Sequence, residues 1–295
     1  MAGMDAQALV RLLHLHWGLS SATISPLGGG MNSETWLVQA GDRSYVAKRV
    51  AASDVAQLAA GSAVAERLAL AGLTTGRPVR TTRGSLVVPG ERLALLGYVP
   101  GRELEGTTRE EQRQIGRTLA EVHAASTLVS DTTGRFFDWL SPAAPGVSAH
   151  PWLPPAIEAA RAAADHLAVT WSVLHTDPAP EAFRHDDATG TTGLIDWTGA
   201  CRGPVLYDVA SAVMYLGGPR HATAFLDAYS AASPLDPAEL LHLDTFRRFR
   251  WAVQAAYFAR RLSTNDLTGI SHQGDNERGL DDARRGLGEL SRAER

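Results

Sequence analysis

Two aspartates that end short apolar runs are the residues of this chain best suited to chemistry. Asp177 follows the run 171–174, and Asp196 ends a second run nineteen residues later. A predicted hairpin across residues 187–190 would return the chain, so we expect both carboxylates at one site. One carboxylate of such a pair can take a proton from a nucleophile while the other binds a divalent cation. The alternative is two unrelated surface or capping residues.

A glycine turn and a lysine in the N-terminal part could bind phosphate. The turn Gly28-Gly29-Gly30-Met31-Asn32 separates two predicted strands, and glycine lets backbone N–H groups approach an anion closely. In the next strand but one, Lys48 shares a face with Val46 and Val50, where an unpaired ammonium group is costly. A phosphate or carboxylate partner would remove that cost. The alternatives are a flexible hairpin turn and a lysine that extends to water.

The elements that must position these residues change type near residue 99. Before it, alternating runs at 34–40 and 44–50 flank a Gly-Asp turn and predict a hairpin, and a helix is expected over 55–72. Four more short strands are expected, at 22–27, 78–81, 85–88 and 93–98. This half therefore predicts a small antiparallel sheet with one helix, preceded by an amphipathic N-terminal helix.

After residue 99 the sequence is mostly helical. The expected helices cover 110–125, 155–167, 205–216, 221–231, 237–262 and 277–293. The predicted fold class is α+β, with a β-rich lobe of residues 1–98 and an α-rich lobe of residues 99–295. Clefts between lobes are common ligand sites.

The composition excludes several classes of protein. With 295 residues, 20% charged residues and a net charge of −4, the chain is typical of a folded protein and atypical of nucleic-acid binders. The single cysteine, Cys201, excludes an internal disulfide and a cysteine-based zinc cluster. No apolar run is long enough to span a membrane, and the N-terminus does not resemble a signal peptide. We therefore expect a cytoplasmic protein with no membrane partner; the oligomeric state cannot be predicted.

In order and spacing, seven segments resemble the aminoglycoside phosphotransferase family, which shares a protein-kinase-like fold with choline kinases and homoserine kinases. They span about residues 20–265 and comprise 27–32, 46–48, 96–101, 119–123, 175–177, 194–197 and 203–210. The resemblance implies a two-lobe kinase that moves the γ-phosphate of ATP or GTP, with Mg²⁺, to a hydroxyl group of a small molecule. Residues 1–98 would form its nucleotide-binding lobe, and residues 99–295 its catalytic and acceptor-binding lobe. The acceptor would be an aminoglycoside, another antibiotic or an amino alcohol.

The resemblance also implies a role for each matching residue. On the nucleotide side, the glycine turn would cover the phosphates with Gly28, Gly29, Gly30 and Asn32. Lys48 would hold the phosphates. The segment between the lobes would bind the nucleotide base through Leu96, Gly97, Tyr98 and Val99. On the catalytic side, Asp177 would face the acceptor hydroxyl, with His175 in the same motif. Asp196 would bind Mg²⁺, and Asp208 would brace the catalytic loop.

The sequence departs from the family pattern at two positions. Ala182 stands where a second metal ligand, an Asn, is usual, and Glu181 could coordinate Mg²⁺ instead. The helix glutamate expected to pair with the strand lysine is also missing, because its register falls at or near Gly61. Glu66 could substitute for it, and Asp54 is a weaker candidate. An impaired pseudokinase that binds nucleotide or metabolite is therefore the alternative function.

The acceptor pocket is expected between the helices over 155–167 and 237–262. The second helix carries the aromatic and basic segment 246–251. One interpretation is core packing with arginines that extend to water. The other is a pocket wall that suits an acceptor with negative charge.

Overall fold

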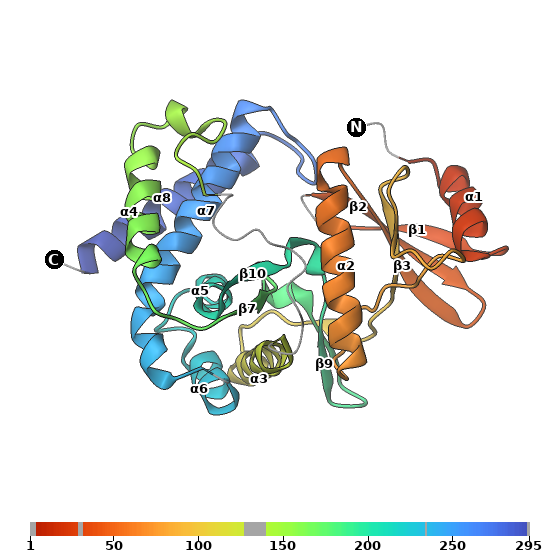
Figure 1. Ribbon diagram of the computed structural model, residues 1–295, viewed down its shortest axis with the longest axis horizontal. Coiled ribbons are helices and arrows are strands. Elements are labelled where there is room, and N and C mark those ends of the chain that lie inside the picture. Colours follow the sequence, from red (N-terminus) through yellow and green to blue (C-terminus); the bar gives the residue numbers. More distant parts are fainter. Residues whose placement is uncertain (1–3, 29–31, 127–139, 234, 294–295) are drawn as a thin grey trace. The chain divides into compact units, whose positions relative to one another are not determined.

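The computed structural model describes residues 4–28, 32–126, 140–233 and 235–293, and the chain forms two compact units (Figure 1). The first unit comprises Met1–Leu104 and Ala182–Ala200, and the second comprises Glu105–Glu181 and Cys201–Arg295. Residues 182–200 therefore group with the N-terminal part of the chain. The functional division into lobes 1–98 and 99–295 stays a prediction.

A five-stranded antiparallel sheet forms the centre of the first unit. Its strands, in spatial order, are β1 (Thr23–Leu27), β2 (Ser33–Ala40), β3 (Arg43–Val50), β5 (Leu93–Gly97) and β4 (Val87–Val88). The predicted hairpin is confirmed, because β2 and β3 pair from Ser33↔Val50 to Ala40↔Arg43. The strand expected at 78–81 is absent: only Pro78 forms a bridge, to Leu96. Proline has no N–H to donate to a ladder, which favours a break at this position.

A helix covers each face of this sheet. On one face, α1 (Ala6–Trp17) packs Leu9 and Leu13 against strand residues such as Val38 and Ala47. On the other face, α2 (Val55–Leu70) packs Leu58 into a cluster with Val50 and Ala94. Figure 1 shows α2 running alongside the strands. Because alternate residues of β3 point to opposite faces, Lys48 belongs to the face that α2 covers.

The hairpin predicted between the two aspartates is also confirmed. β8 (Phe183–Asp186) and β9 (Thr191–Leu194) pair across residues 187–190, and β6 (Arg102–Glu103) adds a third strand. Gly101 precedes β6 with a φ of +105°, and a Cβ there would lie 2.4 Å from the carbonyl oxygen of His185. Only glycine fits this close approach.

The second unit is mainly helical. Its helices are α3 (Arg109–Ser126), α4 (Leu153–Asp165), α5 (Val205–Tyr215), α6 (Thr223–Ala232), α7 (Leu243–Ser263) and α8 (Gly274–Ala293). The long helix expected over 237–262 is two elements, because a 3-10 helix at Pro237–His242 precedes α7; such tight turns are frequent at helix N-termini. A two-stranded sheet joins β7 (Trp171–Leu174) to β10 (Cys201–Pro204). No helix within the described residues is long and apolar enough to cross a membrane.

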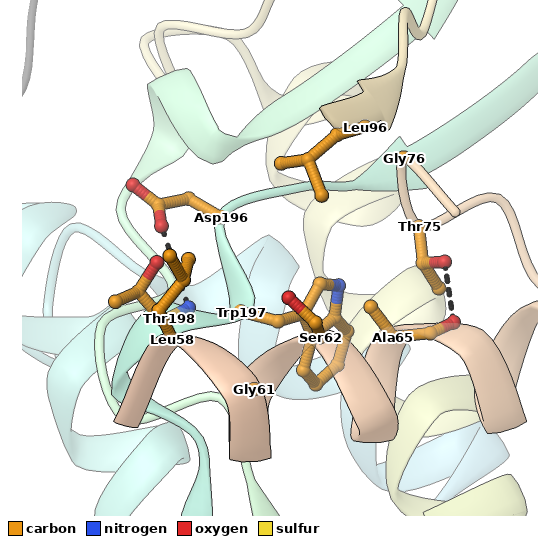
Figure 2. Close-up of a pocket in the computed structure, with 10 residues that line it drawn as sticks. All are labelled: Leu58, Gly61, Ser62, Ala65, Thr75, Gly76, Leu96, Asp196, Trp197 and Thr198. Atoms are coloured by element: carbon orange, nitrogen blue, oxygen red, sulfur yellow. Dashed lines mark hydrogen bonds between the residues drawn. The ribbon is translucent and has the colours of Figure 1, made fainter. Parts of the chain in front are cut away.

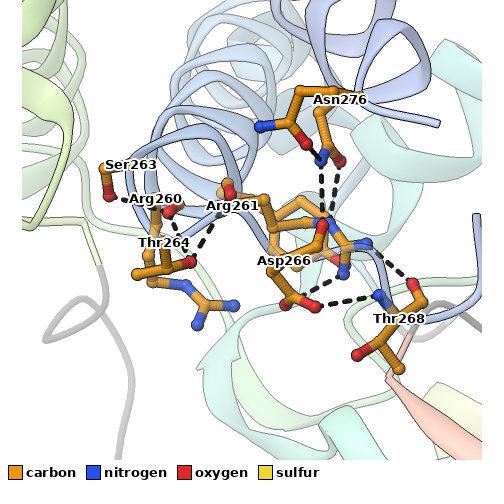
Figure 3. A network of polar contacts seen from close by, with 9 residues as sticks. Arg260, Arg261, Ser263, Thr264, Asp266, Thr268 and Asn276 are labelled. Atoms are coloured by element: carbon orange, nitrogen blue, oxygen red, sulfur yellow. Dashed lines mark hydrogen bonds and ion pairs between the residues drawn. The ribbon is translucent and has the colours of Figure 1, made fainter. Parts of the chain in front are cut away.

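A buried polar network joins the end of α7 to the start of α8 (Figure 3). Arg261 is fully buried, and its guanidinium donates to Asn276 at 2.8 Å, to Asp266 at 3.2 Å and to the carbonyl oxygen of Thr268 at 2.7 Å. The pKa of Asp266 lies below its ordinary value: partial burial opposes this shift, but hydrogen bonds from Thr268 and the charge of Arg261 outweigh it. A buried guanidinium needs such partners, so this network fixes how α8 is attached.

Candidate active site

Lys48 and Asp196 form an ion pair within the first unit. Lys48 Nζ lies 2.5 Å from Asp196 Oδ1, although the two residues are far apart in sequence. Lys48 is 5% exposed, whereas the Asp196 side chain is 52% exposed. The carboxylate thus removes the cost of the buried ammonium, as the sequence required. It also leaves that carboxylate at the surface of the unit.

Lys48 is distinctive in a way that the sequence analysis missed. It is the only lysine in the chain, since 27 of the 28 basic residues are arginine. Arginine has a broad planar fork, whereas lysine carries a compact point charge on a flexible stem. A simple count of residue types would have singled out Lys48 before any motif was considered.

Asp196 is held in an unusual backbone conformation just after β9. Its φ is +67°, in the left-handed region that is uncommon for residues other than glycine. It caps the 3-10 helix Trp197–Gly199, and the backbone N–H of Thr198 points to its Oδ1 at 3.5 Å. Strained conformations of this kind persist where the surrounding structure enforces them, and they are frequent at functional sites.

The segment that follows Asp196 packs tightly on α2. Figure 2 shows Trp197 and Thr198 against the helix, beside a cavity of about 20 Å³ that is also lined by Ser62 and Leu96. This volume is room for about one water molecule. A Cβ at Gly61 would lie 2.0 Å from the carbonyl oxygen of Trp197. The close approach therefore excludes a glutamate at Gly61, which explains why the helix lacks one there.

Substituting Gly61 tests this packing. We expect Gly61→Ala to lower the free energy of unfolding by about 1–3 kcal/mol, because the added methyl group forces α2 and Trp197 apart. The matched control is Gly288→Ala on α8, where a Cβ meets nothing within 4 Å; it should be neutral or stabilising by up to about 1 kcal/mol. Urea denaturation of both variants measures the difference. Equal stability of Gly61→Ala and the parent chain would contradict the tight packing.

Glu66 does not take the place of the missing helix glutamate. Its carboxylate accepts two hydrogen bonds from Arg80, from Nε at 2.8 Å and from Nη2 at 2.5 Å. The Lys48–Glu66 pair considered from the sequence is therefore wrong for this structure, and Asp196 is the partner of Lys48. The weaker candidate, Asp54, accepts from the hydroxyl of Ser53 instead.

In the second unit, Asp208 organises the loop that carries Asp177. The fully buried Asp208 carboxylate accepts the backbone N–H groups of His175 at 2.7 Å and Thr176 at 2.8 Å. His123 Nε2 lies 3.2 Å from the same carboxylate. Thr176 has a φ of +78°, which is strained for a β-branched residue. The bracing role expected of Asp208 is confirmed, whereas the catalytic role of the buried His175 stays a prediction.

Asp177 itself is exposed and held by two side chains that the sequence analysis did not assign to it. The hydroxyl of Tyr215 donates to Asp177 Oδ1 at 2.6 Å, and Arg250 Nη2 donates to the same oxygen at 3.1 Å. The Asp177 side chain is 61% exposed, whereas Arg250 is 7% exposed. Burial of the phenol hydroxyl raises the pKa of Tyr215 above its ordinary value, so this group remains a donor.

The structure describes only some of the other residues predicted to bind the nucleotide. Gly28 and Asn32 are exposed beside β1 and β2, while Gly29 and Gly30 lie outside the described residues. In the segment Leu96–Val99, the N–H groups of Gly97 and Tyr98 already donate to backbone carbonyls of Arg77 and Ser44. These two groups are therefore not available to a nucleotide base as the molecule stands, and the base-binding role of Leu96, Gly97, Tyr98 and Val99 stays a prediction.

The residues expected to bind metal stay predictions as well. Asp196 and the exposed Glu181 belong to different compact units, and so do Asp177 and Asp196, so a site that these residues share stays a prediction. Ala182, where an Asn is usual, is buried and offers no side-chain oxygen. Within the described ranges, no group of three His, Cys, Asp or Glu side chains could hold a metal ion.

Comparison with known proteins places this arrangement in a family. The model of the phosphotransferase enzyme family matches residues 23–264. A protein named homoserine kinase from Azorhizobium caulinodans is 29% identical over 245 residues, which cover 74% of each chain.

Two solved structures share the fold. The amicoumacin kinase hAmiN, in complex with AMP-PNP, Ca²⁺ and Ami, superposes with a TM-score of 0.73 at 15% identity, covering 96% of this chain and 93% of the other. The choline kinase LicA from Streptococcus pneumoniae also gives 0.73, at 16% identity, covering 96% and 98%. Identities this low show the fold alone, but the family model spans most of the sequence. The chain therefore belongs to the phosphotransferase enzyme family.

Proposed function

We propose that the protein transfers the γ-phosphate of ATP to a hydroxyl group of a small molecule, with Mg²⁺ as the metal. The observation that carries the proposal is the buried Lys48 with its exposed partner Asp196. A strand lysine beside a half-exposed carboxylate is the pair that phosphoryl transfer uses, the lysine for the nucleotide phosphates and the carboxylate for the cation. GTP is the alternative donor.

Asp177 would act on the acceptor. Its exposed carboxylate orients the hydroxyl group and accepts the proton, while the hydroxyl oxygen bonds to the γ-phosphorus and the bond from that phosphorus to ADP breaks. Tyr215 and Arg250 both donate to Oδ1, and no residue in the described part of the chain donates to Oδ2. We infer that Oδ2 receives the acceptor hydroxyl.

The residues present fit a hard divalent cation. Asp196 offers carboxylate oxygens on a half-exposed side chain, and Mg²⁺ in phosphoryl-transfer sites is held by one or two carboxylates, phosphates and water. Asp196 would hold the ion, and Glu181 is the proposed second ligand. The cation would neutralise charge on the transferring phosphate. Lys48 would do the same from a fixed position on β3.

Acceptor-dependent release of ADP tests the proposal. We expect ATP and Mg²⁺, with a panel of L-homoserine, choline, aminoglycosides and simple amino alcohols, to give ADP and one phosphorylated acceptor by mass spectrometry. Chelation of Mg²⁺ should abolish both products. If ATP does not bind at all, the kinase proposal fails.

A second candidate, a nucleotide-binding protein without turnover, is favoured by two observations. Ala182 supplies no metal ligand, and Glu66 is engaged by Arg80 rather than by Lys48. Titration of ATP with and without Mg²⁺ separates the two candidates. Equal affinity in both conditions, with no ADP formed over the whole panel, supports the second candidate.

A further inference from the structure

Arg250 is a buried cation next to the proposed catalytic carboxylate. It lies on α7 and is 7% exposed, and its Nε donates to the hydroxyl of Ser211 at 3.0 Å. Its Nη2 donates to Asp177 at 3.1 Å and to the Tyr215 hydroxyl at 3.1 Å. The guanidinium carbon also lies 5.6 Å from the centre of the Tyr215 ring. These contacts fix the orientation of the guanidinium plane.

The third guanidinium nitrogen of Arg250, Nη1, makes none of these contacts. A guanidinium has five N–H donors, and buried donors are normally satisfied. The hydrogen bonds of Arg250 engage Nε and Nη2, and none engages Nη1 among the residues that the structure describes. Nη1 is not an enclosed nitrogen that lacks a hydrogen-bond partner. It therefore reaches accessible space beside Asp177.

We propose that Arg250 binds a carboxylate of the acceptor through Nη1, so that the acceptor is a small hydroxy acid. This inference rests on the proposed function, in which Asp177 orients the acceptor hydroxyl. Arginine suits carboxylates because its planar donors match their geometry. Since Arg250 Nη2 and Asp177 Oδ1 are 3.1 Å apart, hydroxyl and carboxylate must be separated by only a few carbon atoms. A hydroxy amino acid satisfies this requirement, and a cationic group at the same position would be repelled.

Pairs of acceptors that differ only in the carboxylate test the proposal. The pairs are L-homoserine with 3-amino-1-propanol, L-serine with ethanolamine, and L-threonine with 1-amino-2-propanol. We expect kcat/KM to favour the hydroxy acid in at least one pair. In Arg250→Gln that preference should fall by about 10- to 100-fold, mainly through KM, because one charged hydrogen bond is lost.

The ratio within a pair separates acceptor binding from a merely structural role. Misplacement of Asp177 in Arg250→Gln lowers kcat for both members and cancels in the ratio. Arg250→Lys keeps the charge and should restore part of the preference. Arg260→Gln is the matched control, since Arg260 lies exposed on the same helix, and its ratio should equal that of the parent chain.

Three outcomes overturn the proposal while the proposed function stands: indifference to the carboxylate, preference for the amino alcohol, or an unchanged ratio in Arg250→Gln. If no compound in these pairs is phosphorylated, titration of ATP decides the proposed function, while calorimetric titration of L-homoserine decides the inference alone. Saturable binding that Arg250→Gln weakens would support it. The absence of such binding would refute it.

Discussion

Asp177→Asn is expected to reduce acceptor-dependent phosphorylation by about 10²- to 10⁴-fold, the contribution typical of a positioned proton acceptor. An amide occupies the same space and can accept from Tyr215 and Arg250, but it cannot take the proton of the hydroxyl group. The loss should appear in kcat, with the KM for ATP unchanged within about threefold. Steady-state kinetics on the best acceptor measure both constants.

The control for this variant is Asp281→Asn, an exposed carboxylate on α8. It changes the net charge by the same amount and should leave kcat unaltered. A kcat for Asp177→Asn within threefold of the parent value would show that Asp177 does not act on the acceptor.

Lys48→Arg should lower kcat/KM for ATP by about 10²- to 10³-fold, although the positive charge is kept. The 5% exposed site fits a compact ammonium group beside Asp196, and the wider guanidinium would displace Asp196 or the phosphates. Kinetics at varied ATP concentration, together with direct titration of ATP, separate lost binding from lost turnover.

The reverse exchange at the neighbouring position is the matched control. Arg49→Lys lies on the opposite face of β3, where Arg49 Nη1 pairs with Glu34 at 3.0 Å. Partly exposed ion pairs contribute little, so this variant should change kcat/KM by less than about threefold. If Lys48→Arg is equally mild, any cation suffices at this position and the role of Lys48 must be reassigned.

The sequence predicted the local elements well, because alternation and helical spacing are direct consequences of burial. The hairpin that positions Lys48 and the one that precedes Asp196 are both present, with the strands pairing as expected. Two predictions were wrong. The strand at 78–81 is absent, because proline interrupts the ladder there. The start of α7 lies later than predicted, because a 3-10 helix precedes it.

The partners of the site residues were harder to predict. The contact that joins Arg250 to Asp177 spans 73 positions in the chain, and no local pattern encodes it. Glu66 is the only acid in the body of α2, but it pairs with Arg80, which lies in a loop whose path depends on tertiary packing. Gly61 was noticed as a departure, yet only the carbonyl oxygen of Trp197 explains it.

Because the chain contains one lysine, few of its groups can react with reagents for primary amines. Reagents that acylate or alkylate primary amines can reach only the buried ε-amine of Lys48 and the terminal α-amine. Reductive methylation with isotope-labelled formaldehyde would thus place one spectroscopic reporter inside the ion pair with Asp196, where added nucleotide can be followed directly. Immobilisation through amines would in turn attach the molecules by the terminal amine, because a solid support cannot enter the buried site of Lys48.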